Sequence, residues 1–181
     1  MKKNALVWAA MLLWGGISST TAKTYEAIPS ESRLTYFLNH PLHRVEGVSK
    51  NFTCKVDIPE DTLQTRIAVK APVLDFNSGN SNRDAHALET LDAFKHPFVE
   101  FISDSLRRET EGFRVFGKLT FHGIKRPVDF LMIPKYAADK VRLRGKFKIK
   151  LSDFKVERPS LLLVRTDDDL LVEIDVSAKL P

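Results

Sequence analysis

The stretch VRLRGKFKIKL, residues 141–151, alternates apolar and basic residues without a break. Successive side chains of a β-strand point to opposite faces of a sheet, so this pattern predicts one buried face and one solvated face. The apolar set is Val141, Leu143, Gly145, Phe147, Ile149 and Leu151, and the basic set is Arg142, Arg144, Lys146, Lys148 and Lys150. A solvated sheet face explains the basic row, which would also suit a docking stripe for anionic lipid.

The same alternation recurs along most of the chain. The ranges that show it are 32–38, 52–58, 66–73, 113–121 and 170–179. Turn-forming segments such as Asn77–Asn80 and Glu109–Gly112 separate the runs. About eight strands with short connections and no βαβ alternation favour an antiparallel meander, closed as a barrel or folded as a sandwich. Long amphipathic strands favour the barrel, because closure removes exposed edges.

Residues 81–96 break this pattern and are typical of a single short helix. Ser81 and Asp84 have the spacing of a capping box, which predicts where the helix begins. An apolar stripe at helical spacing consists of Leu88, Leu91 and Phe94. His96 precedes Pro97, where helical backbone is disfavoured, so we expect the helix to end there. Such an insert either caps an open end of the barrel or crosses over against the sheet.

The first 22 residues have the composition of a cleavable secretory signal peptide. Lys2 and Lys3 give a positive start, Ala5–Ile17 is an apolar run, and the small residues Thr20–Ala22 suit a cleavage site. The apolar run is shorter than the ~20 residues that cross a bilayer. We therefore expect export to the periplasm and one barrel domain at residues 23–181. A chain of this size buries roughly 70% of its unfolded surface, which is enough for a core without disulfides.

Charge and cysteine content narrow the classes of partner. The formal net charge of +5 is mild, whereas nucleic-acid binding needs a concentrated basic patch, so we predict no nucleic-acid partner. Transient contact with a membrane surface is compatible with this charge. Cys54 is the single cysteine, so no internal disulfide can form. It shares its strand parity with Phe52 and Val56, and we expect a buried, unreactive thiol.

The sequence contains no motif that by itself indicates catalysis. Its five histidines form neither HxH nor HExxH, and it has no GxSxG elbow or glycine-rich phosphate loop. We therefore predict no catalytic residues, no metal ligands and no cofactor. A metal-dependent enzyme with ligands among His86, His96 and His122 is an alternative. A barrel with an apolar interior is better suited to enclosing a small apolar ligand.

Four segments occur in an order that is specific as a set. They are Ser32–Phe37 with His40 and Val45-x-Gly47, Arg83-Asp84-x-His86-x-Leu88 with Phe94 and Pro97-x-x-x-Phe101, Gly117-x-Leu119-Thr120-x-x-Gly123-x-x-x-Pro127-Val128, and Ser152-Asp153-Phe154. Together they resemble the YceI-like lipid/polyisoprenoid-binding family over nearly the whole chain after residue 22. One departure is Lys155, which stands where the family usually has glycine.

The resemblance implies a lipocalin-like, eight-stranded antiparallel barrel with one short helix inserted between strands. It also implies a periplasmic, non-catalytic protein that holds a long-chain isoprenoid or other apolar lipid in a hydrophobic tunnel. Strand parity then predicts the tunnel-wall residues, which are Phe37, Phe52, Val69, Phe101, Val115, Leu119, Phe130, Phe147 and Ile174. The predicted mouth residues are Arg83, Asp84 and His86.

Inward parity alone does not distinguish a wall residue from a packed core residue. The second hypothesis is therefore a barrel with a solid interior that works, without a ligand, as an interaction or stress-response module. Arg83 and Asp84 would then only cap the helix and fix its position. The pattern is equally compatible with a monomer and a homodimer.

Overall fold

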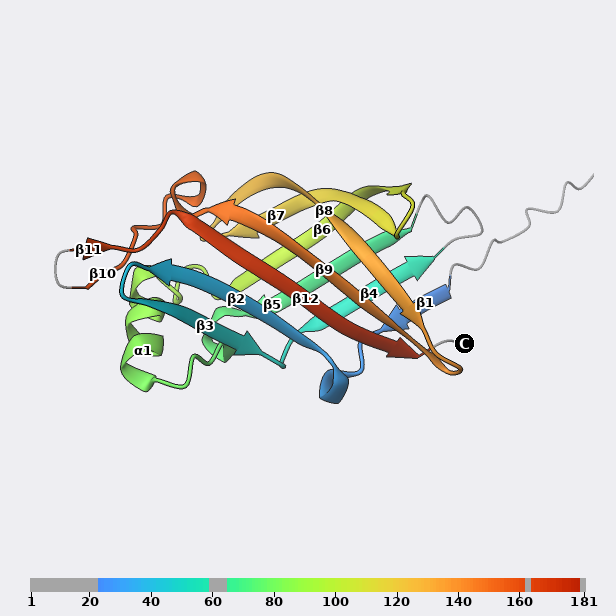
Figure 1. Ribbon diagram of the computed structural model, residues 1–181, viewed down its shortest axis with the longest axis horizontal. Coiled ribbons are helices and arrows are strands. Elements are labelled where there is room, and N and C mark those ends of the chain that lie inside the picture. The colour runs from blue at the N-terminus through green and yellow to red at the C-terminus, as the bar shows by residue number, and fades with distance from the viewer. Residues whose placement is uncertain (1–22, 59–64, 162–163, 180–181) are drawn as a thin grey trace, which may run out of the picture.

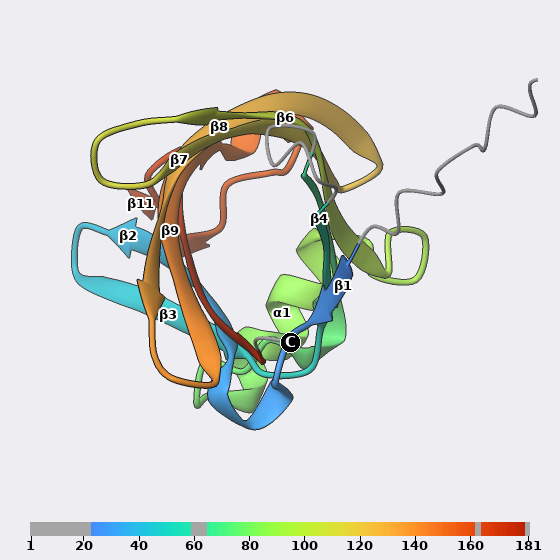
Figure 2. The same ribbon diagram turned by 90° about the vertical axis from the view of Figure 1, so that its right-hand side faces the viewer.

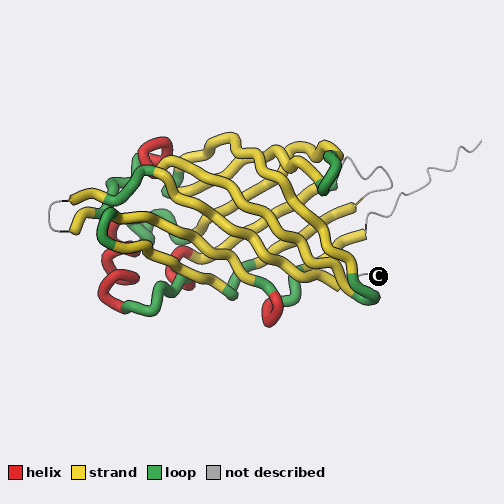
Figure 3. The backbone as a smooth tube through the Cα atoms, viewed as in Figure 1, coloured by secondary structure: helices red, strands yellow, loops and turns green. Residues whose placement is uncertain are grey.

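Ten antiparallel strands hydrogen-bond side by side in one sheet that curls round on itself (Figures 1 and 3). The computed structural model describes residues 23–58, 65–161 and 164–179, so the expected signal peptide lies outside the described residues. In spatial order the strands are β1 (Lys23–Glu26), β4 (Thr53–Ile58), β5 (Arg66–Pro72), β6 (Phe98–Arg108), β7 (Phe113–Phe121), β8 (Ile124–Tyr136), β9 (Lys140–Lys150), β12 (Asp169–Lys179), β2 (Arg33–His40) and β3 (His43–Ser49).

The edge strands β1 and β3 are each tied back to the rest of the barrel. Just after β1, Ala27 forms a bridge with Ala178, and the Ile28 N–H donates to the Ser177 carbonyl at 2.7 Å. Near the end of β3, Val48 forms a second bridge, with Asn77. Figure 2, a view along the barrel, shows the resulting ring of strands. The predicted all-β, lipocalin-like architecture is confirmed.

The sheet has ten strands, whereas we expected about eight. β1 is only four residues long, which is too short to show alternation. The inward set of β3 is Val45, Gly47 and Ser49, so its buried face carries little apolar character. Both additional strands are at the sheet edges. A separate two-stranded hairpin is formed by β10 (Ser160–Leu161) and β11 (Val164–Arg165).

Within the described residues, three short 3₁₀ helices connect the strands: η1 (Pro29–Glu31), η3 (Val73–Asp75) and η4 (Leu151–Phe154). Lys155 ends η4 in the left-handed conformation, with φ of 53° and ψ of 30°. Glycine reaches this region without steric cost, whereas a side chain does not. This backbone geometry explains why glycine is usual there in the family that the sequence resembles, and why Lys155 is a departure.

Helix α1 spans Ser81–Thr90, between η3 and β6. The helix begins at Ser81 as expected, but its N-cap is Asn80, whose side chain accepts from the Arg83 N–H at 3.0 Å, so the capping residue lies one position before the predicted Ser81. The predicted end at His96 was wrong. Asp92 takes a left-handed φ of 43° just after the helix, so the chain turns before the proline is reached. Phe94 is consequently fully exposed and does not extend the apolar stripe.

The helix closes part of one end of the barrel, which is the end seen behind the ring in Figure 2. Ala87, Leu88 and Leu91 line the barrel interior together with strand residues. Of the two uses that the sequence left open, the structure therefore shows the cap. None of the helices in the described residues is long and apolar enough to span a membrane.

Candidate binding cavity

The barrel contains a cavity with a volume of about 190 Å³. Eight strands contribute to its wall, namely β2, β4 to β9 and β12, and α1 contributes to its end. The wall is almost entirely aliphatic and aromatic. Its described side chains with a polar oxygen are Thr35, Tyr36, Asp84 and Thr90. An apolar cavity of about 150 Å³ is enough to bind benzene, so this space admits an apolar guest larger than a single ring.

Six of the predicted wall residues line this cavity. They are Val69, Phe101, Leu119, Phe130, Phe147 and Ile174, one from each of β5, β6, β7, β8, β9 and β12. The Phe130 ring stacks on Phe147 with centroids 5.0 Å apart, and it meets Phe101 at 5.4 Å. These three rings form one continuous aromatic wall.

Phe37, Phe52 and Val115 do not line the cavity. On β2 the inward residues are Tyr36 and Leu38, so Phe37 points to the outer face, where the Arg44 guanidinium lies 3.9 Å from its ring centroid. Phe52 is buried in the connection before β4. Val115 is completely buried and belongs to a part of the interior that side chains fill. For Phe52 and Val115, burial reflects core packing.

At the start of α1, a polar network attaches the preceding loop to the helix. The Asp84 carboxylate accepts from the Ser78 N–H at 3.1 and 3.2 Å and from its hydroxyl. The Arg83 guanidinium donates to the Ser78 hydroxyl at 2.8 Å and to its carbonyl at 2.7 Å. Asp84 lines the cavity, whereas Arg83 does not. His86 is largely exposed and lies 3.8 Å from Glu89, so the structure separates it from the cavity.

Sequence reasoning missed Tyr36, which lines the cavity beside Asp84. A Cβ atom on Gly47, its cross-strand partner, would lie 2.2 Å from the Tyr36 ring, so the ring rests directly on the backbone of β3. The Phe76 ring is 5.7 Å away. Burial and then the Asp84 charge raise the pKa of the Tyr36 hydroxyl, partly opposed by Arg83. The inward parity shared with Leu34 and Leu38 could have identified it.

His40 joins two loops near this end of the barrel. Its Nε2 is 3.0 Å from the Val164 carbonyl oxygen, and its Nδ1 is 3.2 Å from the Leu42 backbone nitrogen. Since a carbonyl only accepts and an N–H only donates, the ring is the neutral tautomer with its proton on Nε2. His40 therefore links the β2–β3 turn to the β10–β11 hairpin, a role that the sequence pattern did not reveal.

Cys54 also faces the cavity and is buried. Burial raises the pKa of its thiol to about 11. Because the thiolate is the reactive species, this side chain behaves as a small apolar wall group near neutral pH.

Only two of the three histidines of the metal hypothesis lie close together. His96 and His122 pack edge to face with ring centroids 4.9 Å apart, and Nδ1 of His122 lies 3.0 Å from the Phe154 carbonyl oxygen. His86 lies on the exposed side of α1. In the described part of the chain, no three His, Cys, Asp or Glu residues form a group that could hold a metal ion.

Comparisons with known proteins agree with this geometry. The profile of the YceI-like domain matches residues 25–178. A UPF0312 protein of Photorhabdus laumondii is 26% identical over an alignment that covers 97% of both chains. A UPF0312 protein of Pseudomonas putida is 26% identical, covering 68% of this chain and 67% of its own.

Solved structures share the fold. Burkholderia cenocepacia BcnA superimposes with a TM-score of 0.77 at 19% identity, covering 83% of this chain and 98% of its own. A polyisoprenoid binding domain from Saccharophagus degradans, implicated in plant cell wall breakdown, gives a TM-score of 0.68 at 12% identity, covering 89% of this chain and 100% of its own. At these identities the likeness shows the fold alone.

Proposed function

Because the chain belongs to the YceI-like domain family, we propose that it holds a long-chain isoprenoid or similar apolar lipid inside its barrel. The observation that carries the proposal is the apolar cavity walled by eight strands and closed in part by α1. The fold shared with a polyisoprenoid binding domain from Saccharophagus degradans supports it. A cavity of this kind favours a binding protein over a barrel with a solid interior.

Burial of the chain supplies the affinity. Each CH₂ group moved from water into an apolar site contributes about 0.8 kcal/mol, before the costs of association. The cavity is only somewhat larger than one that takes a benzene ring, so a short segment of the chain fills it as it stands. A series of isoprenoids of increasing length therefore measures how many units the barrel accepts.

The proposed role is binding without catalysis. Among the described lining residues, Asp84 and Tyr36 carry titratable oxygens, and no histidine accompanies them. A hydrolytic mechanism of the serine or cysteine type needs a nucleophile with a base in hydrogen-bond reach. Cys54 is the thiol on the wall, and its raised pKa works against that role.

We further propose that the protein acts in the periplasm and meets a membrane at its α1 end. Leu42 and Val164, which His40 connects, expose 66% and 42% of their surface, and Arg44 and Arg165 lie close by in sequence. Apolar tips flanked by cations suit the interface of an anionic bilayer. In a flotation assay, the protein should rise with anionic vesicles, and Leu42→Ser should weaken its binding to them. Cell fractionation tests the location.

Lipid extraction of protein purified from its native compartment, followed by mass spectrometry, tests the main proposal. We expect one equivalent of a long-chain apolar lipid per protein. Emptied protein should take up added isoprenoid alcohols or quinones with the same stoichiometry. A protein that is empty when isolated and ignores these ligands would contradict the proposal.

A further inference from the structure

The few titratable groups on the cavity wall are all acids. The described lining residues include Asp84, Tyr36 and Cys54 but no lysine, arginine or histidine. An anion moved out of water is costly unless a counter-charge or several hydrogen-bond donors compensate it. The wall offers no such counter-charge, and Asp84 adds a like charge.

Arg83 is the cation beside Asp84 in the sequence, and two of its five N–H donors bond to Ser78. Nε donates to the Ser78 hydroxyl at 2.8 Å, and one terminal nitrogen donates to the Ser78 carbonyl at 2.7 Å. These bonds turn the guanidinium toward the Asn77–Asn80 loop, and the side chain does not line the cavity. Arg83 therefore supports the loop that holds Asp84 in place.

Tyr36 offers a hydrogen-bond donor on the cavity wall. Its raised pKa keeps the phenol protonated at neutral pH. Its ring is fixed between the backbone at Gly47 and the ring of Phe76. No described residue of the protein forms a hydrogen bond with its hydroxyl, whereas the Thr90 hydroxyl, also on the wall, donates to the His86 carbonyl at 2.8 Å.

The Asp84 carboxylate provides a matching acceptor. It accepts from the backbone and the hydroxyl of Ser78, and a carboxylate has about four acceptor sites, so it can receive a further donor. Tyr36 and Asp84 interact electrostatically and both line the cavity. One ligand hydroxyl could therefore accept from Tyr36 and donate to Asp84.

On the basis of the proposed function, we infer that the cavity selects a lipid with an uncharged, hydroxyl-bearing end and discriminates against its phosphorylated form. A hydroxyl satisfies both the phenol and the carboxylate. A phosphate has the wrong charge for Asp84 and meets no cation on the described wall. The discrimination follows from the wall, so it should not depend on the identity of the tail.

Two ligands with the same tail, geranylgeraniol and geranylgeranyl phosphate, test the inference by calorimetric titration of the purified protein. We expect the phosphate to bind at least tenfold more weakly than the alcohol. Asp84→Asn should reduce this ratio at least threefold, because it removes the like charge. Ser78→Ala is the matched control, since it loosens the same loop while keeping the carboxylate, and the ratio should persist.

Tyr36→Phe removes the hydroxyl alone. We expect about fivefold weaker binding of the alcohol and less than twofold change for a C20 isoprenoid hydrocarbon without a polar end. Equal affinity for alcohol and phosphate, or an unchanged ratio in Asp84→Asn, would overturn the inference and leave the proposed function standing. Failure of all three ligands to bind would overturn both.

Discussion

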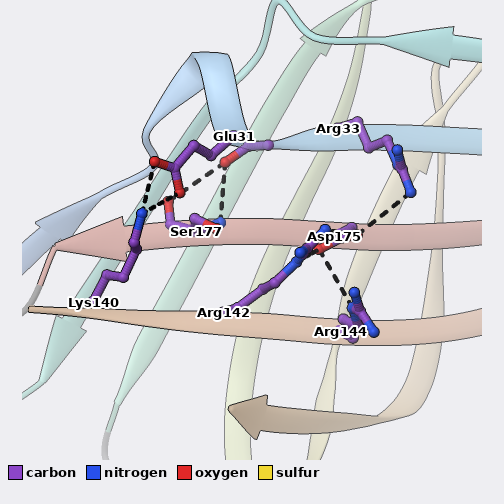
Figure 4. A network of polar contacts seen from close by, with 8 residues as sticks. Glu31, Arg33, Lys140, Arg142, Arg144, Asp175 and Ser177 are labelled. Carbon is purple, nitrogen blue, oxygen red and sulfur yellow. Dashed lines mark hydrogen bonds and ion pairs between the residues drawn. The ribbon is translucent and has the colours of Figure 1, made fainter. Parts of the chain in front are cut away.

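Ile174 and Asp175 are neighbours on β12 that face opposite environments. Ile174 lines the apolar cavity. Asp175 points outward and is held by arginines from two adjacent strands (Figure 4). Arg142 reaches both of its oxygens, at 2.5 and 2.7 Å, while Arg144 and Arg33 each lie 3.6 Å away. The strand thus separates an apolar inner face from an ionic outer face.

Other basic residues of the outer face also lie beside acidic ones. Lys140 contacts both oxygens of Glu31 at 2.8 Å, and Lys148 lies 3.7 Å from Asp169. Lys146 stands directly across from Glu173 in the register of β9 and β12. The basic row that the sequence left open between a solvated face and a docking stripe therefore has acidic neighbours on β12, which favours the solvated face.

The inner face leaves the Tyr36 hydroxyl without a hydrogen-bond partner among the described residues, and it leaves part of the barrel volume unfilled. Both features reduce stability, because interior packing and satisfied hydrogen bonds stabilise the fold. The outer ionic network and the strand pairing compensate on the same strands. The contrast indicates that the inner face is arranged for a guest and the outer face for stability.

The largest expected effect comes from filling the inner face. Val69→Trp places an indole in the cavity, and we expect isoprenoid binding to fall at least about a hundredfold. The matched control is Ala68→Trp, because Ala68 is the adjacent, exposed residue of β5. Its affinity should stay within about twofold of the original. Calorimetric titration measures both, and unimpaired binding by Val69→Trp would place the ligand outside the cavity.

The second largest effect is expected when the ionic network of the outer face is broken. Asp175→Asn leaves the arginines without their carboxylate, and we expect a loss of about 2 kcal/mol in the free energy of unfolding at pH 7. Urea denaturation measures this loss, and lipid affinity should change little. Lys118→Gln, which affects an exposed pair with Asp104, is the control and should cost less than about 0.5 kcal/mol.

The stability that Asp175→Asn removes should depend on pH. The side-chain bonds from Arg142, and then the surrounding arginine charges, hold the pKa of Asp175 below its ordinary value. A carboxylate with a lowered folded-state pKa stabilises the protein above its unfolded pKa of about 3.9 and loses that contribution as pH falls through the folded value. The difference between the original protein and Asp175→Asn should therefore shrink below about pH 4. A difference that is constant from pH 7 to pH 3 would contradict this account.

A smaller effect is expected at Gly47, beneath Tyr36. Gly47→Ala introduces a Cβ 2.2 Å from the tyrosine ring, which must then move toward the cavity. We expect a destabilisation of about 1 kcal/mol and weaker lipid binding. Thermal unfolding and titration measure the two effects. Restoration of stability by the double variant Gly47→Ala, Tyr36→Leu would identify the ring as the cause.

The smallest effect concerns Cys54 on the inner face. Since its pKa is raised to about 11, we expect native protein at pH 8 to react with a thiol reagent at least about tenfold more slowly than urea-unfolded protein. Bound lipid should slow the reaction a few-fold further by covering the thiol. A native rate equal to the unfolded rate would show that the cavity is freely open to solvent.

Much of the fold could be predicted because side-chain alternation is a local property. Most of the run 141–151 lies on β9, which ends at Lys150, the run 170–179 lies on β12, and α1 occupies part of the helical segment. The limits of α1 were less accurate, since the Asn80 cap and the left-handed Asp92 are backbone features without a distinctive spacing.

The candidate site could be predicted only in part. Parity placed Phe101, Leu119 and Phe130 correctly toward the interior, because each lies in the middle of a long strand. For Phe37, parity predicted the wrong face of the sheet. Tyr36 and Phe37 are adjacent aromatic residues, so either assignment of the strand faces turns one aromatic ring inward. The structure decides for Tyr36, because Gly47 on the next strand leaves room for its ring.

An antiparallel sheet with one apolar face follows from residue order alone, since a period of two fixes the face on which each side chain lies. Where the interior is filled, as at Val115, and where it is hollow, as between Phe101, Phe147 and α1, depends on how the strands pack in three dimensions. The reason is that packing depends on side chains from strands that are far apart in the chain, and no local pattern records how closely those strands approach across the barrel.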